Sequence, residues 1–491
     1  MAPIYSRPDE VNQSDPARPT FTRPLSSAPA MGIQESPLPP AHSLTEAPGT
    51  RWSLPTLLAF RFFCLYFTLY VLATQMLMSM IILPARWFPE SNTIKLWNEK
   101  LESFQNQIQQ MVEWTATEVF KVDHPLVIFS GSGDKTFDWV LTFCLLVIAA
   151  AITIAWSLIA YRFQNHATCH KWFRLFLRFA LGSTLVTYGV MKAIPLQMPE
   201  PSLTRLLEPY GQFTPMGVLW SSIGASPAYE IFTGCAELTA AILLFIPRTT
   251  LLGAAVALGV TSQVFILNMT YDVPVKLFSF HLVLMSLFLL APDAPRLLRL
   301  FLLDRPAGPS SVPALFRTQW ANATCVILQL LFAAYIIGMG FDGALQGWKT
   351  YGGGAPKSEL YGVWNVTSMT TDSVDRPPLL TDNERWRRVV IDRPVFGKPS
   401  FYMIAFQRMD DSFAWYQSQI DVNAKTLTLT HDDNSGWTGV FTYEQPSPQQ
   451  LILDGQWDGK PVHIQLDLFP RVQFPLVSRG FHWVQEYPYN H

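Results

Sequence analysis

Seven long apolar runs constrain this chain more than any other feature of its sequence. Each run has about the 20 apolar residues that a helix needs to cross the hydrocarbon core of a bilayer. They lie near residues 57–83, 137–160, 173–195, 227–247, 250–270, 276–300 and 319–340. Charged residues make up 15% of the chain, against roughly 25% in ordinary soluble domains. The sequence therefore predicts an α-helical multi-span membrane bundle with about seven spans.

The distribution of basic residues predicts an orientation. The region 137–172 holds the second span and a basic loop, the next loop on the same side carries Arg248, and the stretch after the sixth span is rich in arginine from Arg296 onward. Loops rich in lysine and arginine stay on the cytoplasmic side. We therefore expect a multi-pass protein of the cell inner membrane, with a cytoplasmic amino terminus and a periplasmic or otherwise extracytoplasmic carboxyl-terminal part.

The regions around the spans differ in composition. Residues 1–50 are rich in Pro, Ser and Ala, which predicts a disordered cytoplasmic tail. Residues 51–136 would hold the first span and an outer loop, and 304–340 a linker and the last span. The outer loop has apolar residues at intervals of three and four, as in an amphipathic helix: Trp97, Leu101, Phe104, Ile108 and Met111.

Residues 341–491 change character and alternate apolar with polar residues at a period of two. Asp-Gly turn signals separate the runs, which predicts an antiparallel β-sheet or small barrel outside the membrane. The final stretch "SRGFHWVQEYPYN" allows two interpretations. It is either a last strand that closes the sheet with its aromatic residues inward, or a binding surface over the outer mouth of the bundle.

Polar residues inside the spans are the candidates for function. A charge at membrane depth costs roughly 2.5–3.5 kcal/mol on insertion scales, so such groups should face the bundle interior, pair or be neutral. Glu237 is the strongest case: it is either a proton-handling or ligand-binding carboxyl with Lys192 or His281 as partner, or a group that fixes helix packing by a hydrogen bond. The catalytic candidates are thus Glu237, His281 and Lys192, and the ligand-binding candidates are Tyr188, Glu230, Glu237, Asn268 and His281.

Structural roles compete with several of these assignments. Glu230 lies in a first helical turn, where the helix dipole alone favours a carboxylate. Lys192 could extend its ammonium group to the interface, Asn268 could bridge two helices, and Tyr188 could be an interfacial aromatic residue. In the turn between the fifth and sixth spans, Pro274 would break the helix. Two charged residues are expected to fix this loop beside the proline: Asp272 and Lys276.

Other site classes find little support. The stretch "GSGDKT" lacks the Gly-Lys order of a phosphate-binding loop, and the five cysteines include no Cys-x-x-Cys pair. No metal site is predicted. The net charge of −2 gives no reason to expect a nucleic-acid partner, so the partners we expect are the lipid bilayer and a membrane or periplasmic protein.

Residues 173–303 include three stretches, "YGVMKAIPLQMPEPSLTRLLEPYGQFTPMGVLW", "SPAYEIFTGCAELTAAILLFIPRTTLLGA" and "LNMTYDVPVKLFSFHLVLMSLFLLAPD", that resemble the DoxX-like membrane proteins. They resemble in particular a large bacterial subgroup with a carboxyl-terminal extramembrane β domain. The resemblance implies a four-helix membrane core and a subunit of a membrane redox complex, handling a quinone or another lipophilic ligand in an outward-facing pocket. The alternative is a non-catalytic membrane scaffold whose outer β domain binds a protein partner or an envelope ligand.

Overall fold

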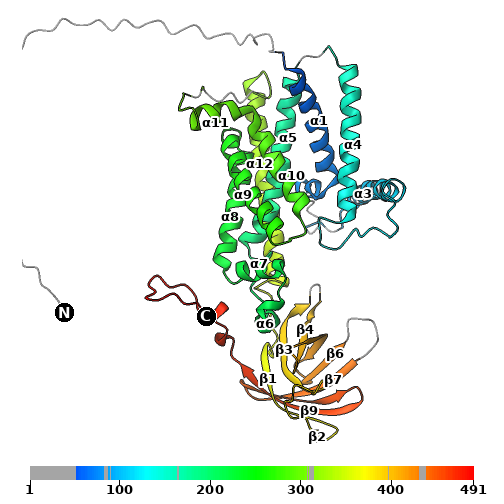
Figure 1. The fold of residues 1–491 in the computed structure, drawn as a ribbon, viewed down its shortest axis with the longest axis vertical. Coiled ribbons are helices and arrows are strands. Elements are labelled where there is room, and N and C mark those ends of the chain that lie inside the picture. The colour runs from blue at the N-terminus through cyan, green and yellow to red at the C-terminus, as the bar shows by residue number, and fades with distance from the viewer. Residues whose placement is uncertain are drawn as a thin grey trace, which may run out of the picture. The chain divides into compact units, whose positions relative to one another are not determined.

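The computed structural model contains a helical region followed by a β-barrel (Figure 1). The residues that it describes are 51–81, 87–88, 90–162, 165–306, 308, 314–395, 398–430 and 438–490. The predicted tail 1–50 and the end of the first predicted span lie outside these residues. The fold class is therefore as predicted, a helical membrane region joined to a carboxyl-terminal antiparallel β domain.

Six segments of the described structure, rather than seven, are long and apolar enough to cross a membrane. They are α1 (Leu54–Ala73), α4 (Thr136–Ile159), α8 (Pro227–Phe245), η2 with α9 (Pro247–Thr270), α10 through α11 (Lys276–Phe301) and α12 (Gln319–Thr350). The predicted span near 173–195 falls in α5 (Ala167–Ala193), whose 27 residues give about 40 Å at 1.5 Å per residue. Charged residues such as Lys171 and Arg178 lower its hydropathy, so α5 is long enough to span but is not apolar enough to count among the six.

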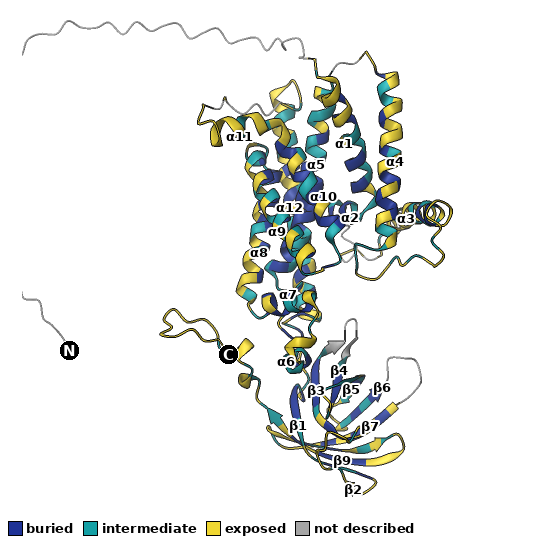
Figure 2. Cartoon of the chain, in the orientation of Figure 1, coloured by how far each residue is buried: buried dark blue, intermediate teal, exposed yellow. Residues whose placement is uncertain are grey.

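α5 is the central helix of the bundle. Figure 2 shows buried residues along much of its length, and it packs against α8, α12, α10 and α1. Because its neighbours cover it, a basic residue such as Arg178 can sit in α5 without facing lipid. The chain is thus a multi-span membrane protein in which the least apolar long helix of the bundle occupies the protein interior.

Arginines close the carboxyl-terminal ends of three helices. The last carbonyls of a helix lack intrahelical partners and lie at its negative end, so a cation that donates to them is stabilising. The donations are Arg61 to Ala160 O (3.2 Å) after α4, Arg174 to Leu289 O (3.2 Å) in α10, and Arg178 to Leu244 O (2.9 Å) and Phe245 O (3.2 Å) in α8. These arginines of α1 and α5 therefore have a structural role.

The first predicted span is shorter than expected. α1 ends at Ala73, the next residue is extended, and α2 (Gln75–Met80) then starts a new helix. The outer loop contains α3 (Asn92–Glu118), which runs across the direction of α1 and α4 (Figure 1). Its apolar stripe is half-buried at Ile108 but exposed at Trp97. Short helices α6 (Leu203–Leu207) and α7 (Pro215–Gly224) follow α5.

Eight antiparallel strands close into a barrel, because β1 pairs with β9 as well as with β3. A two-residue strand, β2, extends one hairpin. The strands are β1 (Gly362–Thr371), β2 (Val374–Asp375), β3 (Trp386–Val395), β4 (Lys398–Arg408), β5 (Phe413–Asp421), β6 (Thr426–Thr430), β7 (Thr438–Ser447), β8 (Gln450–Trp457) and β9 (Lys460–Phe469). Alternate residues of each strand point inward, and large side chains such as Trp364, Phe406 and Phe441 fill the interior.

The prediction of a last strand in "SRGFHWVQEYPYN" is wrong. β9 ends at Phe469, and the chain continues through η4 (Arg471–Gln473) and α13 (Pro475–Ser478) into a stretch that the structure describes without a strand. β1 already occupies the place beside β9 that a closing strand would take. The aromatic residues therefore remain in solvent, with Trp483 91% exposed.

Candidate functional site

A cavity of about 800 Å³ lies among α1, α2, α3, the loop before α4, the start of α4, and the ends of α5 and α10. Its size falls within the range of roughly 300–1,000 Å³ that is usual for small-molecule sites. Its lining includes apolar side chains: Leu72, Leu77, Met78, Leu101, Phe104, Ile108, Phe137, Leu141 and Phe278. It also includes residues with polar groups: Tyr70, Gln75, Gln105, Gln109, Ser132, Lys135, Asp138 and Tyr188. A lining of both kinds suits an amphipathic molecule.

Of the predicted catalytic and ligand-binding residues, Tyr188 is the one that lines this cavity. Gln75 Nε2 donates to Tyr188 Oη at 2.9 Å, and the Tyr188 ring lies 6.0 Å from that of Phe278. Because the Tyr188 oxygen already accepts from Gln75, its own hydroxyl hydrogen can point to a ligand oxygen. Gln75 was not singled out from the sequence, because it falls where the first apolar run was expected to continue as one helix.

His281 does not line the cavity but packs behind Tyr70, which does. Its ring stacks on Tyr70 with centroids 3.9 Å apart and planes 8° apart. Nδ1 lies 2.7 Å from the Leu277 carbonyl oxygen, and Nε2 lies 2.6 Å from Tyr66 Oη. A carbonyl can only accept, so Nδ1 donates to Leu277, and in the neutral ring Nε2 then accepts from the Tyr66 hydroxyl. This geometry fits a neutral His281 and places its ring against Tyr70 at the cavity.

Lys192 and Glu237 meet at the crossing of α5 and α8. Each follows a glycine by three residues, in Gly189-x-x-Lys192 and Gly234-x-x-Glu237, and the two glycines face each other across the crossing. An added Cβ at Gly234 would lie 2.6 Å from Gly189 O, so only glycine lets the two backbones approach so closely. Lys192 Nζ then forms an ion pair with Glu237 Oε1, with both side chains 6% exposed.

Two further candidates hold neighbouring segments together. Glu230 Oε1 accepts from the backbone amide of Met198 at 2.8 Å, which ties the start of α8 to the segment after α5. Asn268 Nδ2 donates to Ser279 Oγ at 3.0 Å and so joins α9 to α10. The structure therefore places the predicted polar residues in separate contacts: Lys192 with Glu237, His281 with Tyr66 and Tyr70, Glu230 with Met198, and Asn268 with Ser279.

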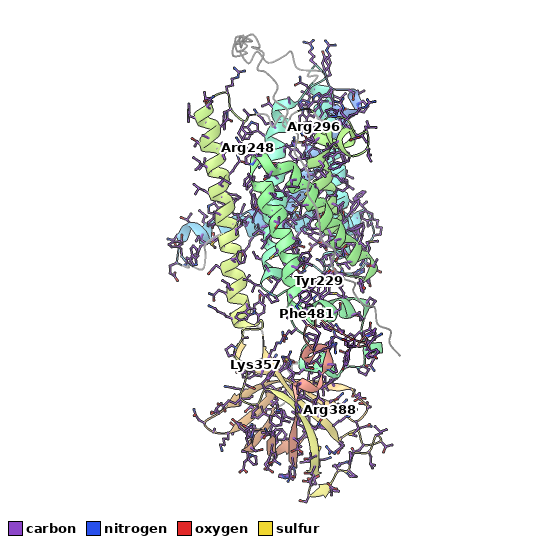
Figure 3. All side chains as sticks on the ribbon, turned by 90° about the vertical axis from the view of Figure 1, so that its left-hand side faces the viewer. Tyr229, Arg248, Arg296, Lys357, Arg388 and Phe481 are labelled. Atoms are coloured by element: carbon purple, nitrogen blue, oxygen red, sulfur yellow. The ribbon has the colours of Figure 1, made fainter. Side chains whose placement is uncertain are left out.

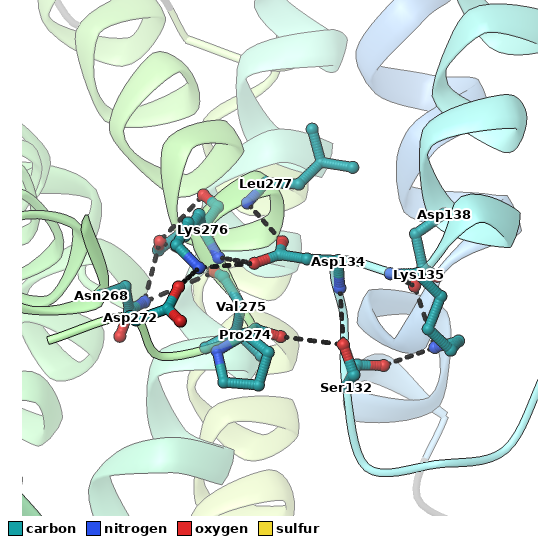
Figure 4. A network of polar contacts seen from close by, with 11 residues as sticks. Ser132, Asp134, Lys135, Asp138, Asn268, Asp272, Pro274, Val275, Lys276 and Leu277 are labelled. Carbon is teal, nitrogen blue, oxygen red and sulfur yellow. Dashed lines mark hydrogen bonds and ion pairs between the residues drawn. The ribbon is translucent and has the colours of Figure 1, made fainter. Parts of the chain in front are cut away.

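The loop 131–135 forms a clasp on the turn between α9 and α10 (Figure 4). The Asp134 carboxylate accepts from the amides of Lys276 and Leu277, each at 2.9 Å, and so caps the start of α10 from 142 residues away. Gly133 N donates to Pro274 O at 2.7 Å. The predicted loop-fixing residues take part: Pro274 through this bond, and Lys276 through ion pairs to Asp272 (2.8 Å) and Asp134 (3.7 Å).

The clasp also shapes the cavity. Ser132, Gly133 and Lys135 on one side and Val275 and Leu277 on the other all belong to its lining. The "GSGDKT" stretch is therefore a docking loop in this fold. Its sequence did not reveal this role, because the contact joins two loops that lack hydrophobic periodicity.

Replacing Asp134 with alanine is expected to destabilise the start of α10. Loss of a capping side chain costs about 0.5–2 kcal/mol, and two amides lose their acceptor here. Hydrogen exchange of the purified protein should therefore quicken in peptides that contain Lys276 and Leu277. Asp123→Ala is the matched control, because Asp123 is exposed in the same outer loop and contacts only its neighbour His124 among the interactions found there. Equal exchange in both variants would show that the clasp does not hold α10.

No group of three or more His, Cys, Asp or Glu side chains within the described ranges could hold a metal ion.

No family model matches this chain, and no solved structure matches it. A curated relative is the uncharacterized protein YwoB of Bacillus subtilis strain 168. The two are 33% identical over 129 residues, which cover 26% of this chain and 79% of YwoB. Because the aligned region covers most of YwoB, this chain belongs to the same family as YwoB. It carries in addition a large part that YwoB does not match.

Proposed function

We propose that this protein binds an amphipathic lipophilic molecule, of which a quinone is the leading class, in the cavity beside Tyr188. The observation that carries the proposal is the mixed polar and apolar lining of a cavity of about 800 Å³ at one end of a membrane helix bundle. A quinone has carbonyl oxygens that only accept hydrogen bonds and an apolar tail. Tyr188 and Gln75 offer donors, and Leu77 and Phe104 offer an apolar wall.

In this proposal the protein is a subunit of a membrane redox complex of the DoxX-like kind, and the cavity faces the extracytoplasmic side. The resemblance of residues 173–303 supports the class of complex, and the basic loops support the orientation. Tyr188 contacts the ligand. His281 acts on the cavity through Tyr70, on which it stacks. Lys192 and Glu237 hold α5 against α8 and do not contact the ligand.

A non-catalytic scaffold is the second candidate, and the β-barrel favours it. Side chains fill the barrel interior, so the barrel would act through its outer surface. The tail beyond α13 offers exposed aromatic residues for a partner, among them Phe481 and Trp483. If function depends on this tail and is indifferent to the cavity, the scaffold is the correct function.

Filling the cavity should weaken ligand binding. Ala73 lines the cavity at the end of α1, and Ala73→Phe would place a ring inside it. We expect binding of a short-chain quinone to the detergent-purified protein, measured by equilibrium titration, to weaken at least about tenfold, which is about 1.4 kcal/mol. The quinone content of the purified protein, measured by mass spectrometry of its lipid extract, should fall in parallel.

Ala151→Phe is the control, since Ala151 is exposed on α4 and the substitution is the same. If both variants bind the quinone as the parent does, the cavity is not the site. A variant lacking residues 479–491 tests the scaffold in the same preparation, because it leaves the barrel strands and the cavity complete.

A further inference from the structure

A second, smaller pocket of about 230 Å³ lies where the helical region meets the barrel. Its walls come from the segment after α5, the start of α8, the end of α12 and the segment after α12. Strand β3 and Arg471 complete them. Lys357 lies between the end of α12 and the barrel strands (Figure 3). We call this the junction pocket; it is separate from the cavity beside Tyr188.

Positive charge dominates the lining of the junction pocket. Lys357, Arg393 and Arg471 come from three separate segments of the chain, and Glu200 is the carboxylate among the lining residues. Arg471 bonds the Glu200 carboxylate at 2.6 Å, whereas Arg393 donates to the Glu200 backbone carbonyl at 2.5 Å. Because Arg393 binds a neutral backbone carbonyl, the Glu200 carboxylate offsets one of the three positive charges, that of Arg471.

Several donors of this lining remain available to a ligand. Lys357 Nζ lies 4.4 Å from the centroid of the Tyr361 ring, a contact with a neutral group. Arg471 Nε is buried and has no hydrogen-bond partner among the described residues. A buried donor without a partner costs free energy, so the Arg471 guanidinium keeps unsatisfied hydrogen-bonding capacity at the pocket wall.

A further carboxyl group faces this region and is already engaged. Asp392, next to Arg393 on β3, is buried and accepts from the Leu203 amide at 2.8 Å. Burial raises the pKa of Asp392, and the amide of Leu203 and the charge of Arg393 oppose that rise. Asp392 therefore ties α6 to β3, and its charge is the least favourable feature of the surroundings for an anion.

The position of the pocket suggests the kind of anion. Pro227, the first residue of α8, and Trp348, in the last turn of α12, both line it. Each belongs to the end of a segment that can cross the membrane, so the pocket lies near the boundary between membrane and water. Tryptophan is enriched at that boundary, the start of a helix favours anions, and arginine and lysine pockets beside membrane helices bind lipid head groups.

We propose that the junction pocket binds a phosphoryl group and that an anionic phospholipid head group supplies it. A lipid held there would contact the end of α12, β3 and Arg471 at once, and would thereby hold the barrel at the membrane surface. This proposal rests on the junction pocket alone and does not depend on the quinone site.

The test uses the full-length protein, delipidated in a neutral detergent. Phosphatidylglycerol, phosphatidylcholine or inorganic phosphate is added back, and native mass spectrometry and thermal unfolding report binding. Lys357→Glu is the variant, because Lys357 is exposed and the change should leave the fold intact. Lys425→Glu is the matched control at the exposed turn between β5 and β6.

Reversing one charge near a lipid surface replaces attraction for an anionic head group by repulsion, so we expect phosphatidylglycerol to bind Lys357→Glu at least about tenfold more weakly. The control should bind as the parent does, and phosphatidylcholine should bind both weakly. Stabilisation of the parent by inorganic phosphate alone, lost in Lys357→Glu, would assign the pocket to free phosphate instead. Equal phosphatidylglycerol binding by Lys357→Glu and Lys425→Glu would overturn the proposal, as would unchanged binding by Arg393→Gln.

Discussion

Lys192→Met is expected to lower the free energy of unfolding by about 3–5 kcal/mol, because it leaves the Glu237 carboxyl buried without its cation. Both side chains are 6% exposed, so neither can recover its interaction with water. The cost of an unpaired buried charge, rather than the strength of the pair, sets the size of this effect. Equilibrium unfolding in mixed micelles gives the measurement.

The double variant Lys192→Met/Glu237→Leu provides the control. Replacing both members of a buried pair by apolar residues is often neutral or stabilising, so most of the lost stability should return. If the single and double variants are equally unstable, the pair does not account for the loss. If the double variant is stable but no longer binds or reduces a quinone, Lys192 and Glu237 have the functional role that the sequence also allows.

Gly234→Val should disrupt the helical region at the crossing of α5 and α8. The added side chain would meet the backbone of Gly189 and Ala193, which cannot move aside as a flexible side chain could. Overpacking commonly costs about 1–3 kcal/mol, and a clash with the α5 backbone at both Gly189 and Ala193 should reach or exceed the upper value. The yield of monodisperse protein and its thermal unfolding temperature in detergent report the effect.

Gly259→Val is the matched control for the helix crossing. Gly259 lies in α9, and an added Cβ there meets nothing within 4 Å. Because both changes put the same branched residue into a helix, they share the same intrinsic propensity cost. A similar loss of stability in both variants would mean that propensity, and not the close approach of α5 and α8, limits the fold.

The pattern of apolar and polar residues in the sequence predicts most of the fold. The apolar runs located the membrane helices, and the alternation after residue 341 located the β domain, because both patterns record which face of an element is buried. α5 is the exception: its interior position in the bundle lets it carry Arg178, so it is less apolar than the six candidate spans although its run is among the seven predicted. Closure of the sheet was left open, since the pairing of β1 with β9 joins strands from opposite ends of the domain.

The site was less accessible to sequence reasoning. The sequence offers Lys192 or His281 as the partner of Glu237, and the structure pairs Glu237 with Lys192. The cavity could not be foreseen, because its lining joins the break after Ala73, α3 and the clasp loop 131–135, which are distant in the sequence. Contacts between irregular loops, such as Asp134 with the start of α10, follow from tertiary packing and leave no periodic signal.

Photoaffinity labelling with an azido-quinone tests the central claim most directly, because it reports the place of binding as well as binding itself. Purified protein is illuminated with the probe, with and without excess unlabelled quinone, and adducts are mapped by peptide mass spectrometry. We predict adducts that the competitor suppresses in peptides from residues 70–78, 101–109 and 128–142, which line the cavity, and their loss in Ala73→Phe. Adducts confined to the lipid-facing side of α12, or adducts that the competitor and Ala73→Phe leave unchanged, would contradict a quinone site in this cavity.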